Sequence, residues 1–400
     1  MPQVLFVFGT RPEAIKLAPL IAELRRDPAF AVRICVTGQH REMLAQVLRL
    51  FDITPDVDLD VMQPGQELSE IAAAILAKLP AVLRETRPDV VVVQGDTTSA
   101  FAAGLAAFYA GIDVAHVEAG LRSGDSFSPW PEEVNRKLLS VVTRFHFAPT
   151  DEARANLVSE GIDPARIHVT GNTVIDALQQ TVSRIAADDA LRGRLDSEFA
   201  FLDRERRMIL VTGHRRESFG AGLQSICDAV AEIASDHGDV DVVYPVHLNP
   251  NVRLPVHRIL GGNARVHLVE PVDYLSFVHL MTRSDFILTD SGGVQEEAST
   301  LGKPVLVMRD TTERAEGVRA GNMRVVGTQR DAIVTEAKLL LRDPAHHQTM
   351  SRPCNAFGDG QACARIAAIL RKETDASRRF LTQRVAAHAD QQHEIAGQHP

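Results

Sequence analysis

Three carboxylates in the first half of the chain stand where a parallel sheet would place chemistry. Asp96 comes directly after Val90–Gln94, Glu118 ends the apolar run that begins at Val114, and Glu132 lies in the first turn of a helical segment. Asp96 is able to cap the helix that follows it, and the helix dipole favours an acid at the position of Glu132. A carboxylate at the end of a buried strand, however, loses hydration unless it is paired or functional. Three acids at neighbouring strand ends are more than capping requires.

Positive charge gathers at two other expected strand ends. Arg11 and Lys16 flank the start of a helix after the first apolar run, which is an arrangement suited to holding an anion. His214 follows a later run and is itself followed by Arg215 and Arg216, so it is placed to meet a phosphate. Taken separately, these side chains are equally compatible with surface cations and a structural histidine.

The strongest local signal is a serine and two glycines, Ser291, Gly292 and Gly293, between a strand and a helix. Their backbone N–H groups would point at a ligand above the turn. Glu297 lies one helical turn further on, within reach of a sugar hydroxyl, and Arg314 follows the next strand. A tight turn explains the glycines but not these neighbours. From the residues alone we expect a two-domain enzyme for a phosphorylated sugar or nucleotide, with carboxylates from the first domain and a phosphate cradle in the second.

Other common chemistries lack their motifs. The turn after the first strand is neither a dinucleotide-binding G-x-G-x-x-G nor a Walker loop, and Gly302-Lys303 is followed by Pro304. His116 lies near Glu118, but we expect its side chain to point into the core. No serine or cysteine constellation stands out, and no metal-ligand spacing is present, so we expect no metal.

The elements that position these residues alternate between short β-branched runs and amphipathic helices, which is typical of a parallel sheet covered on both faces. The alternation is interrupted by a polar stretch from Ala187 to Arg207 and then resumes, so we expect two doubly wound α/β units with a ligand cleft between them. The expected strands are Val4–Phe8, Val32–Thr37, Val90–Gln94, Val114–Glu118, Phe145–Ala148, Ile167–Val169, Met208–Thr212, Val240–Pro245, Val266–Val269, Phe286–Thr289, Pro304–Met308 and Met323–Val326. The expected helices of the first unit include Pro12–Arg26, Glu67–Arg84, Thr98–Ala110 and Glu132–Val142.

Composition limits the class of protein. The 400 residues, 45% hydrophobic and 24% charged, exclude a disordered chain. The net charge of -9 provides no global positive field for a nucleic acid or an anionic membrane. The four cysteines are far apart, which favours reduced thiols. The first residues show no signal-peptide pattern, and the longest apolar run, Ala100 to Ile112, is shorter than the roughly 20 residues that cross a bilayer. We expect a soluble, cytoplasmic protein that binds neither nucleic acid nor membrane.

Nine stretches, in this order, strongly resemble the non-hydrolysing bacterial UDP-N-acetylglucosamine (UDP-GlcNAc) 2-epimerases. They extend over the chain from about residue 4 to residue 375. The stretches are Phe8–Leu20, Thr37–Leu44, Val93–Ser99, His116–Asp125, Ser128–Arg136, Val169–Ala177, Thr212–Phe219, Tyr244–Asn249 and Thr289–Glu297.

The resemblance implies the fold of GT-B glycosyltransferases, in which two Rossmann-like domains face a cleft that closes on a UDP-sugar. It implies interconversion of UDP-GlcNAc and UDP-N-acetylmannosamine (UDP-ManNAc) without NAD or another cofactor, by elimination of UDP to 2-acetamidoglucal and re-addition. It also implies a homodimer that serves bacterial surface polysaccharide synthesis. We expect an N-terminal domain over 1–170, a UDP-binding domain over 171–375 whose last helix packs back on the first, and a polar, disordered extension over 376–400.

The resemblance also implies roles for individual residues. Loss of UDP builds oxocarbenium character that acidifies the C2–H bond, and a proton that leaves one face and returns to the other needs at least two acid/base groups. The implied catalytic residues are Asp96, Glu118, Glu132 and His214, with Glu118 and Glu132 favoured for proton transfer and His214 for stabilising the departing diphosphate. The implied substrate-binding residues are Arg11 and Lys16 at the diphosphate, Phe277 at the uridine, Ser291, Gly292 and Gly293 at phosphate oxygens, Glu297 at the ribose and Arg314 as a further polar contact.

Two further expectations concern the nucleotide and its regulation. Val272 stands where some relatives carry Gln, so a side-chain contact to the nucleotide is replaced at most by a backbone contact. Some family members bind a second UDP-GlcNAc as an activator near the segment that matches Gln39-His40-Arg41 and Gln46, which is intact here. We therefore predict allosteric activation by substrate.

Three other functions remain open at this stage. A hydrolysing 2-epimerase would release free N-acetylmannosamine, and a GT-B glycosyltransferase would move the sugar to an acceptor. A non-catalytic UDP-sugar sensor would bind UDP without exchanging the C2 proton, although it has no need of three acids.

Overall fold

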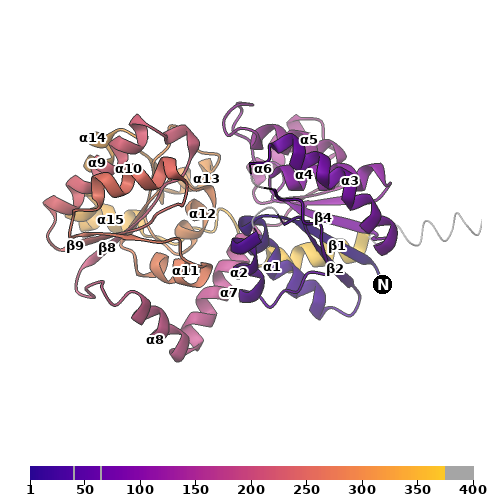
Figure 1. The fold of residues 1–400 in the computed structure, drawn as a ribbon, viewed down its shortest axis with the longest axis horizontal. Helices are drawn as coiled ribbons and strands as arrows, with labels where there is room; N and C mark the ends of the chain where they lie inside the picture. The colour runs from indigo at the N-terminus through magenta and orange to yellow at the C-terminus, as the bar shows by residue number, and fades with distance from the viewer. Residues whose placement is uncertain (39–40, 64, 374–400) are drawn as a thin grey trace, which may run out of the picture.

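The computed structural model describes residues 1–38, 41–63 and 65–373 and contains two parallel sheets, each covered by helices (Figure 1). The first sheet has the strand order β3-β2-β1-β4-β5-β6-β7. Its strands are β1 Gln3–Phe8, β2 Ala31–Val36, β3 Val57–Asp58, β4 Val90–Gln94, β5 Asp113–Val117, β6 Phe145–Ala148 and β7 Ile167–Val169. The helices of this unit are α1 Arg11–Arg26, α2 Arg41–Leu50, α3 Leu68–Thr86, α4 Thr98–Tyr109, α5 Glu132–Val142 and α6 Asp151–Ser159.

The second sheet has the strand order β10-β9-β8-β11-β12-β13. Its strands are β8 Arg207–Thr212, β9 Val240–Pro245, β10 Val266–Val269, β11 Phe286–Thr289, β12 Val305–Val307 and β13 Met323–Val325. Its helices are α9 Ala221–Asp236, α10 Pro250–Leu260, α11 Tyr274–Arg283, α12 Gly292–Thr300, α13 Ala315–Ala320, α14 Arg330–Arg342 and α15 Pro344–Met350. The α/β class with two parallel sheets is therefore confirmed.

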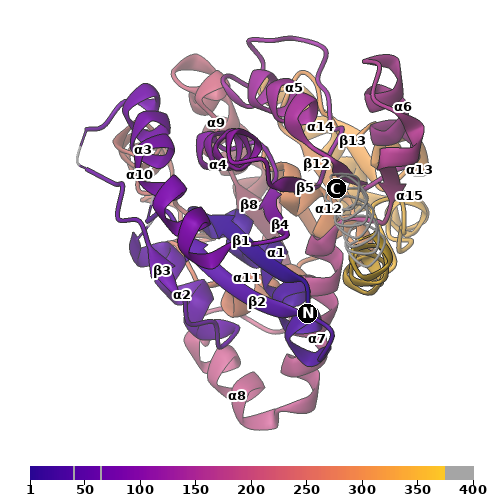
Figure 2. The same cartoon turned by 90° about the vertical axis from the view of Figure 1, so that its right-hand side faces the viewer.

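Alternation along the strands explains why helices cover both faces. Phe6 and Phe8 of β1 pack with α1 and α7 (Thr173–Ala187), whereas Leu5 and Val7 pack with α3 and α4 on the opposite face. Figure 2 shows α3 and α4 on one side of the first sheet and α1 and α7 on the other. Because both faces are dry, the strands are almost continuously apolar, which is the pattern that predicted them.

Most expected strands are found within a residue or two of their bounds, but two elements were not expected. The two-residue strand β3 is too short to give a periodic signal, and it pairs with Cys35 and Val36 of β2. The polar stretch from Ala187 to Arg207 contains α8, Asp189–Glu198, whose Leu191 and Leu195 are its buried residues. Because this helix has so few buried apolar residues, its sequence lacks the apolar period that predicts a helix and resembles a linker.

The chain crosses between the two units twice. It leaves the first unit after β7 and enters α7, which packs against α1 of the first unit and against α11 and α12 of the second. It returns after α15 to a helical segment over residues 362–373, drawn in yellow beside α1 in Figure 1. Ile366 and Leu370 of that segment are buried in the same cluster as Leu20 and Leu24 of α1.

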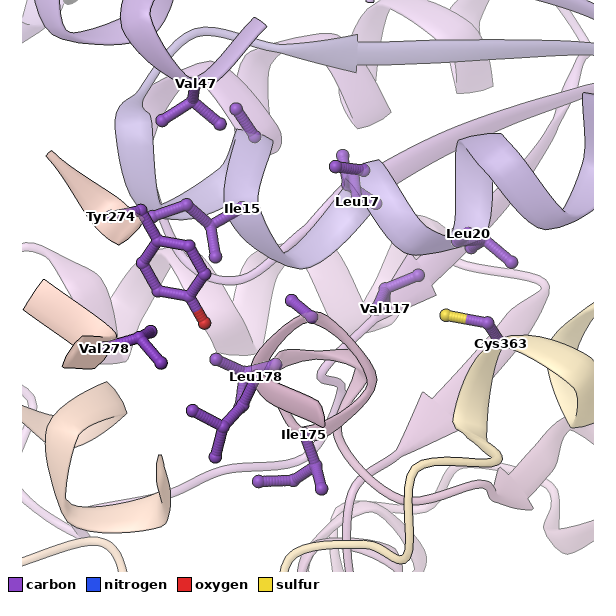
Figure 3. Packing of buried hydrophobic residues seen from close by; sticks show 14 of the residues in the cluster. Ile15, Leu17, Leu20, Val47, Val117, Ile175, Leu178, Tyr274, Val278 and Cys363 are labelled. Carbon is purple, nitrogen blue, oxygen red and sulfur yellow. The ribbon is translucent and has the colours of Figure 1, made fainter. Parts of the chain in front are cut away.

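One apolar cluster runs through both units. Figure 3 shows Leu178 of α7 near Val278 of α11, and Ile15 of α1 beside Tyr274 of α11. Burial of this kind stabilises folded chains by about 25 cal/mol per Å² of apolar surface, so this cluster holds the two units against each other. Within the part of the chain that the structure describes, no helix is long and apolar enough to span a membrane.

Candidate functional site

The turn after β1 places Arg11 against the second unit. The Thr10 side chain caps α1 by accepting from the Glu13 N–H, and the Glu13 carboxylate accepts from the Thr10 N–H at 2.7 Å in return. Arg11 Nη2 donates to the carbonyl oxygen of Val272 at 3.0 Å, a contact between residues 261 positions apart. Burial lowers the pKa of Arg11 although Asp273 opposes the effect. The backbone of Val272 thus meets Arg11 in this structure.

Asp96 is held by an arginine and does not cap a helix. The cap of α4 is Thr97, whose side chain accepts from the Ala100 N–H, so the capping interpretation of Asp96 is wrong. Arg136 of α5 donates to Asp96 Oδ2 through Nε at 2.9 Å and Nη2 at 2.6 Å. Burial opposes ionisation of Asp96, but Arg136 outweighs it and lowers the pKa. Asp96 is therefore a stable carboxylate.

Glu118 is buried between a lysine and an amide. It follows β5 with a φ of 69°, a conformation that turns its side chain out of the strand direction. Lys16 Nζ donates to Glu118 Oε2 at 2.5 Å, and Asn172 Nδ2 donates to the same oxygen at 2.6 Å. Burial favours the neutral acid, but the charges of Lys16 and Arg314 outweigh it and lower the pKa of Glu118. In this structure Lys16, expected at the diphosphate, lies against the acid.

Glu132 has the opposite electrostatic environment. It is the first residue of α5 and is half-buried, and its Oε2 has no hydrogen-bond partner among the described residues. Burial raises the pKa of Glu132, and the neighbouring charge of Asp96 adds to the effect. A carboxyl group with a raised pKa is better suited than an ordinary one to hold and donate a proton.

On the facing edge of the second sheet, His214 is oriented by Asp290. The Asp290 Oδ2 atom accepts from the backbone N–H groups of His214 at 2.7 Å and Arg215 at 2.8 Å. His214 Nδ1 lies 3.3 Å from Asp290 Oδ1, and the imidazole stacks on His247 with ring centroids 5.5 Å apart. Asp290 thus fixes the backbone at His214, and the imidazole lies beside this buried carboxylate and stacks on His247.

The glycine turn after β11 is built around Arg314. Ser291 is the N-cap of α12, and a Cβ on Gly292 would lie 2.8 Å from the Arg314 guanidinium. Arg314 Nε donates to Glu296 Oε1 at 2.9 Å. A Cβ on Gly293 would meet nothing closer than 3.9 Å. Gly292 therefore leaves the space that Arg314 occupies. The first backbone N–H groups of α12 have no partners within the helix and point outward from its N-terminus.

Glu297 is buried beneath this turn. It accepts a hydrogen bond from the Tyr274 hydroxyl at 2.6 Å. Burial raises the pKa of Glu297 to about 7 against the effect of that hydrogen bond. Phe277, three residues beyond Tyr274 on α11, is partly buried against the shared apolar cluster.

Four charged residues that sequence reasoning left without a role link the two edges. Arg136 Nη2 lies 3.8 Å from Glu313 Oε1 of the second unit, and Arg309 Nη1 donates to Glu313 Oε2 at 2.9 Å. Burial opposes ionisation of Glu313, but Arg314 and Arg309 outweigh it and hold its pKa well below its usual range. These residues and Glu296 are buried charges. Their positions in the sequence are unexceptional, so only the fold shows that they belong to this network.

The remaining expectations divide into three groups. His116 is fully buried with Nε2 2.7 Å from the Gly95 carbonyl oxygen, and burial lowers its pKa to about 4, so it is a core residue as expected. Gln46 is an exposed residue of α2. Gln39, His40 and the extension 376–400 lie outside the described residues. Among the residues described, no group of three or more His, Cys, Asp or Glu side chains is arranged to hold a metal ion.

Two parallel sheets whose carboxyl edges meet, with acids on one edge and a glycine turn, His214 and Arg314 on the other, define an α/β enzyme of the GT-B type. The sequence profile described as UDP-N-acetylglucosamine 2-epimerase matches residues 22–371. The chain belongs to the UDP-N-acetylglucosamine 2-epimerase family.

Individual relatives agree with this assignment. The UDP-N-acetylglucosamine 2-epimerase of Escherichia coli K12 is 58% identical over 364 residues, covering 91% of this chain and 97% of the relative. The crystal structure of the Neisseria meningitidis UDP-GlcNAc 2-epimerase bound to UDP-GlcNAc has a TM-score of 0.91 at 48% identity, with coverages of 92% and 100%. The S. aureus MnaA–UDP structure has a TM-score of 0.87 at 44% identity, with coverages of 94% and 97%.

Proposed function

We propose that this protein is a non-hydrolysing UDP-GlcNAc 2-epimerase that interconverts UDP-GlcNAc and UDP-ManNAc. The observation that carries the proposal is the meeting of three acids of the first unit, Asp96, Glu118 and Glu132, with the cation-rich edge of the second. Relatives of high identity bear the epimerase name, and similar structures hold UDP-GlcNAc or UDP. The product would supply bacterial surface polysaccharide synthesis.

The chemistry requires the leaving group to depart before or with the C2 proton. The C2–H bond has no adjacent carbonyl, so a base alone is too weak at neutral pH. Loss of UDP from C1 builds positive charge on the ring, and this charge acidifies C2–H. Nearby carboxylates stabilise the positive charge. Removal of the proton gives 2-acetamidoglucal, to which UDP returns while a proton is delivered to the opposite face of C2.

The environments of the acids fit different roles in this sequence. Glu118, with a lowered pKa, is the carboxylate suited to accept a proton, whereas Glu132, with a raised pKa, is suited to deliver one. The reverse reaction exchanges the two roles. Asp96, held ionised by Arg136, stabilises the positive charge of the ring.

The second unit would hold the nucleotide and stabilise the departing diphosphate. His214 and Arg11 are assigned to the diphosphate, and the N–H groups at Gly292 and Gly293 to phosphate oxygens. The list of binding residues is completed by Ser291 at the phosphates, Glu297 at the ribose, Phe277 at the uridine, and Lys16 and Arg314 as further positive charges.

The experiment that tests the function is incubation with UDP-GlcNAc alone in D₂O, followed by NMR. We expect UDP-ManNAc to appear and deuterium to enter C2 of both sugars with no other additive. Accumulation of free N-acetylmannosamine would indicate the hydrolysing reaction instead. Absence of C2 exchange, with UDP still bound, would refute the epimerase proposal in favour of a transferase or a sensor.

We further propose assembly as a homodimer through the outer surface of α4 and α5. This surface exposes five large apolar side chains, which is more than isolated surface positions require. They are Phe108, Tyr109, Val134, Leu138 and Val141. All four cysteines are free and buried, which supports function in the reducing cytoplasm.

We also propose domain boundaries and a mode of regulation. We place the boundaries near residues 170 and 375, with 171–375 as the UDP-binding domain. We propose activation by a second UDP-GlcNAc near Gln46, which is testable as sigmoidal kinetics that a Gln46→Ala substitution makes hyperbolic.

A further inference from the structure

The first crossing between the units contains Asn172, which is hydrogen-bonded both to the returning segment and to the start of α7. Gly171 leaves the first unit with a φ of 87°, and a Cβ there would lie 3.1 Å from the Cα of Gly358 in the returning segment. Asn172 follows, and its backbone N–H donates to the Phe357 carbonyl oxygen at 2.7 Å. Its side-chain Oδ1 accepts from the Val174 N–H and caps α7. Asn172 is therefore fixed where the two crossings meet.

The side-chain amide of Asn172 joins an acid of each unit. Its Nδ2 donates to Glu118 Oε2 at 2.6 Å and to Glu296 Oε2 at 2.5 Å. The three residues are 1%, 6% and 1% exposed for Asn172, Glu118 and Glu296. An amide nitrogen has two hydrogens, and both are used here, one for each unit.

The two cations beside these acids, Lys16 and Arg314, each donate to the acid of their own unit. Lys16 donates to Glu118 of the first unit, and Arg314 donates to Glu296 of the second. A second carboxylate this close to Glu118 raises its affinity for a proton. Any separation of the units at the two crossings moves Glu296 and Arg314 away from Glu118 and breaks the shared amide bond. The charge of Arg314, which lowers the pKa of Glu118, is then lost together with that of Glu296.

We infer that Asn172 and Glu296 are positioning residues that make Glu118 a competent proton acceptor only when the two units are together. Asn172 fixes the carboxylate of Glu118 by a hydrogen bond, and Glu296 counters the charge of Arg314, which lowers the pKa of Glu118. The inference deepens the proposed epimerase function and rests on it. It couples C2 deprotonation to enclosure of the sugar, so the base acts only on an enclosed substrate.

The first test replaces Asn172→Ser, because serine retains an N-cap oxygen for α7 and cannot bridge two carboxylates. We expect kcat to fall about 10-fold or more while the Kd for UDP stays within about 3-fold of the wild-type value. Asp188→Ser is the matched control, since Asp188 is the exposed N-cap of α8, far from the acids, and its kcat should equal that of the wild type. A kcat of Asn172→Ser within about 2-fold of wild type would overturn the inference.

The second test does not depend on how much of the variant folds. Glu296→Gln keeps the shape and an acceptor oxygen but removes the charge beside Glu118. We expect the acidic limb of the kcat–pH profile to move to lower pH by about 0.5 unit or more, because Glu118 loses a neighbour that favours its protonation. Partial loss of folded protein would lower kcat equally at every pH and would not shift the acidic limb. An acidic limb at the wild-type pH would therefore overturn the inference.

The wild-type assay separates this inference from the proposed function. If the wild-type protein fails to exchange the C2 proton, the epimerase proposal fails and the inference falls with it. If the wild-type protein epimerises and both variants match it in kcat and pH profile, only the inference falls.

Discussion

Glu297 should make the stability of the protein fall with rising pH. Its side chain is buried, and burial raises its pKa from 4.5 to about 7 in the folded state. An acid with a raised folded pKa contributes stability that is fully present below its unfolded pKa and is lost as the pH rises through the folded value. At about 1.4 kcal/mol per pKa unit, the whole interval corresponds to about 3 kcal/mol, of which about 2 kcal/mol is lost between pH 5 and pH 8.

The Glu297→Gln substitution isolates this contribution because glutamine does not titrate and still accepts from Tyr274. Urea unfolding of both proteins at pH 5, 6, 7 and 8 gives the difference in unfolding free energy at each pH. We expect the variant to gain about 2 kcal/mol relative to wild type between pH 5 and pH 8. The exposed Glu205→Gln substitution serves as the control and should show no such gain. Parallel pH dependences for wild type and Glu297→Gln would refute the buried, raised-pKa description of this acid.

Three further predictions concern the acids and the phosphate cradle. Glu118→Gln should lower kcat by about 10²–10⁴-fold while calorimetry still detects UDP binding, and near-normal turnover would remove it from proton transfer. Arg136→Lys should lower kcat by about 10-fold, because one ammonium cannot reproduce the two hydrogen bonds of a guanidinium, and an unchanged kcat would show that this pairing is not needed. Gly292→Ala should lower the thermal midpoint, because its Cβ would lie 2.8 Å from Arg314, whereas Gly293→Ala should not; equal midpoints would contradict the packing described.

The elements could be predicted because their signals are local. The strands β9, β10 and β11 have the bounds that apolar runs between turn residues predict, and α5 begins at Glu132 as expected. β3 could not be predicted, since two residues carry no period. The interpretation of Asp96 as a helix cap was wrong because Thr97 caps α4, whereas Asp96 accepts from Arg136, a residue 40 positions away that no local pattern indicates.

The sequence indicated which residues to consider for the candidate site, but it did not indicate which of them form pairs. Acids and glycines that follow strands are visible in sequence because parallel strands bring their carboxyl ends to one edge. The ion pair of Lys16 with Glu118 spans 102 positions, and nothing in either segment specifies the other. Glu296 resembles any helical glutamate in sequence, and only its burial beside Arg314 makes it exceptional.

The sequence by itself determined the periodicity of apolar residues, the turns that end each strand, and therefore two α/β units with chemistry at their edges. The tertiary structure alone decided which acid has a lowered pKa, which has a raised pKa, and that Asn172 connects Glu118 to Glu296 across the two units. The physical reason is that backbone preferences act over a few residues, whereas burial and Coulomb interaction depend on distance in space. Proton affinity at this site is therefore a property of the assembled fold.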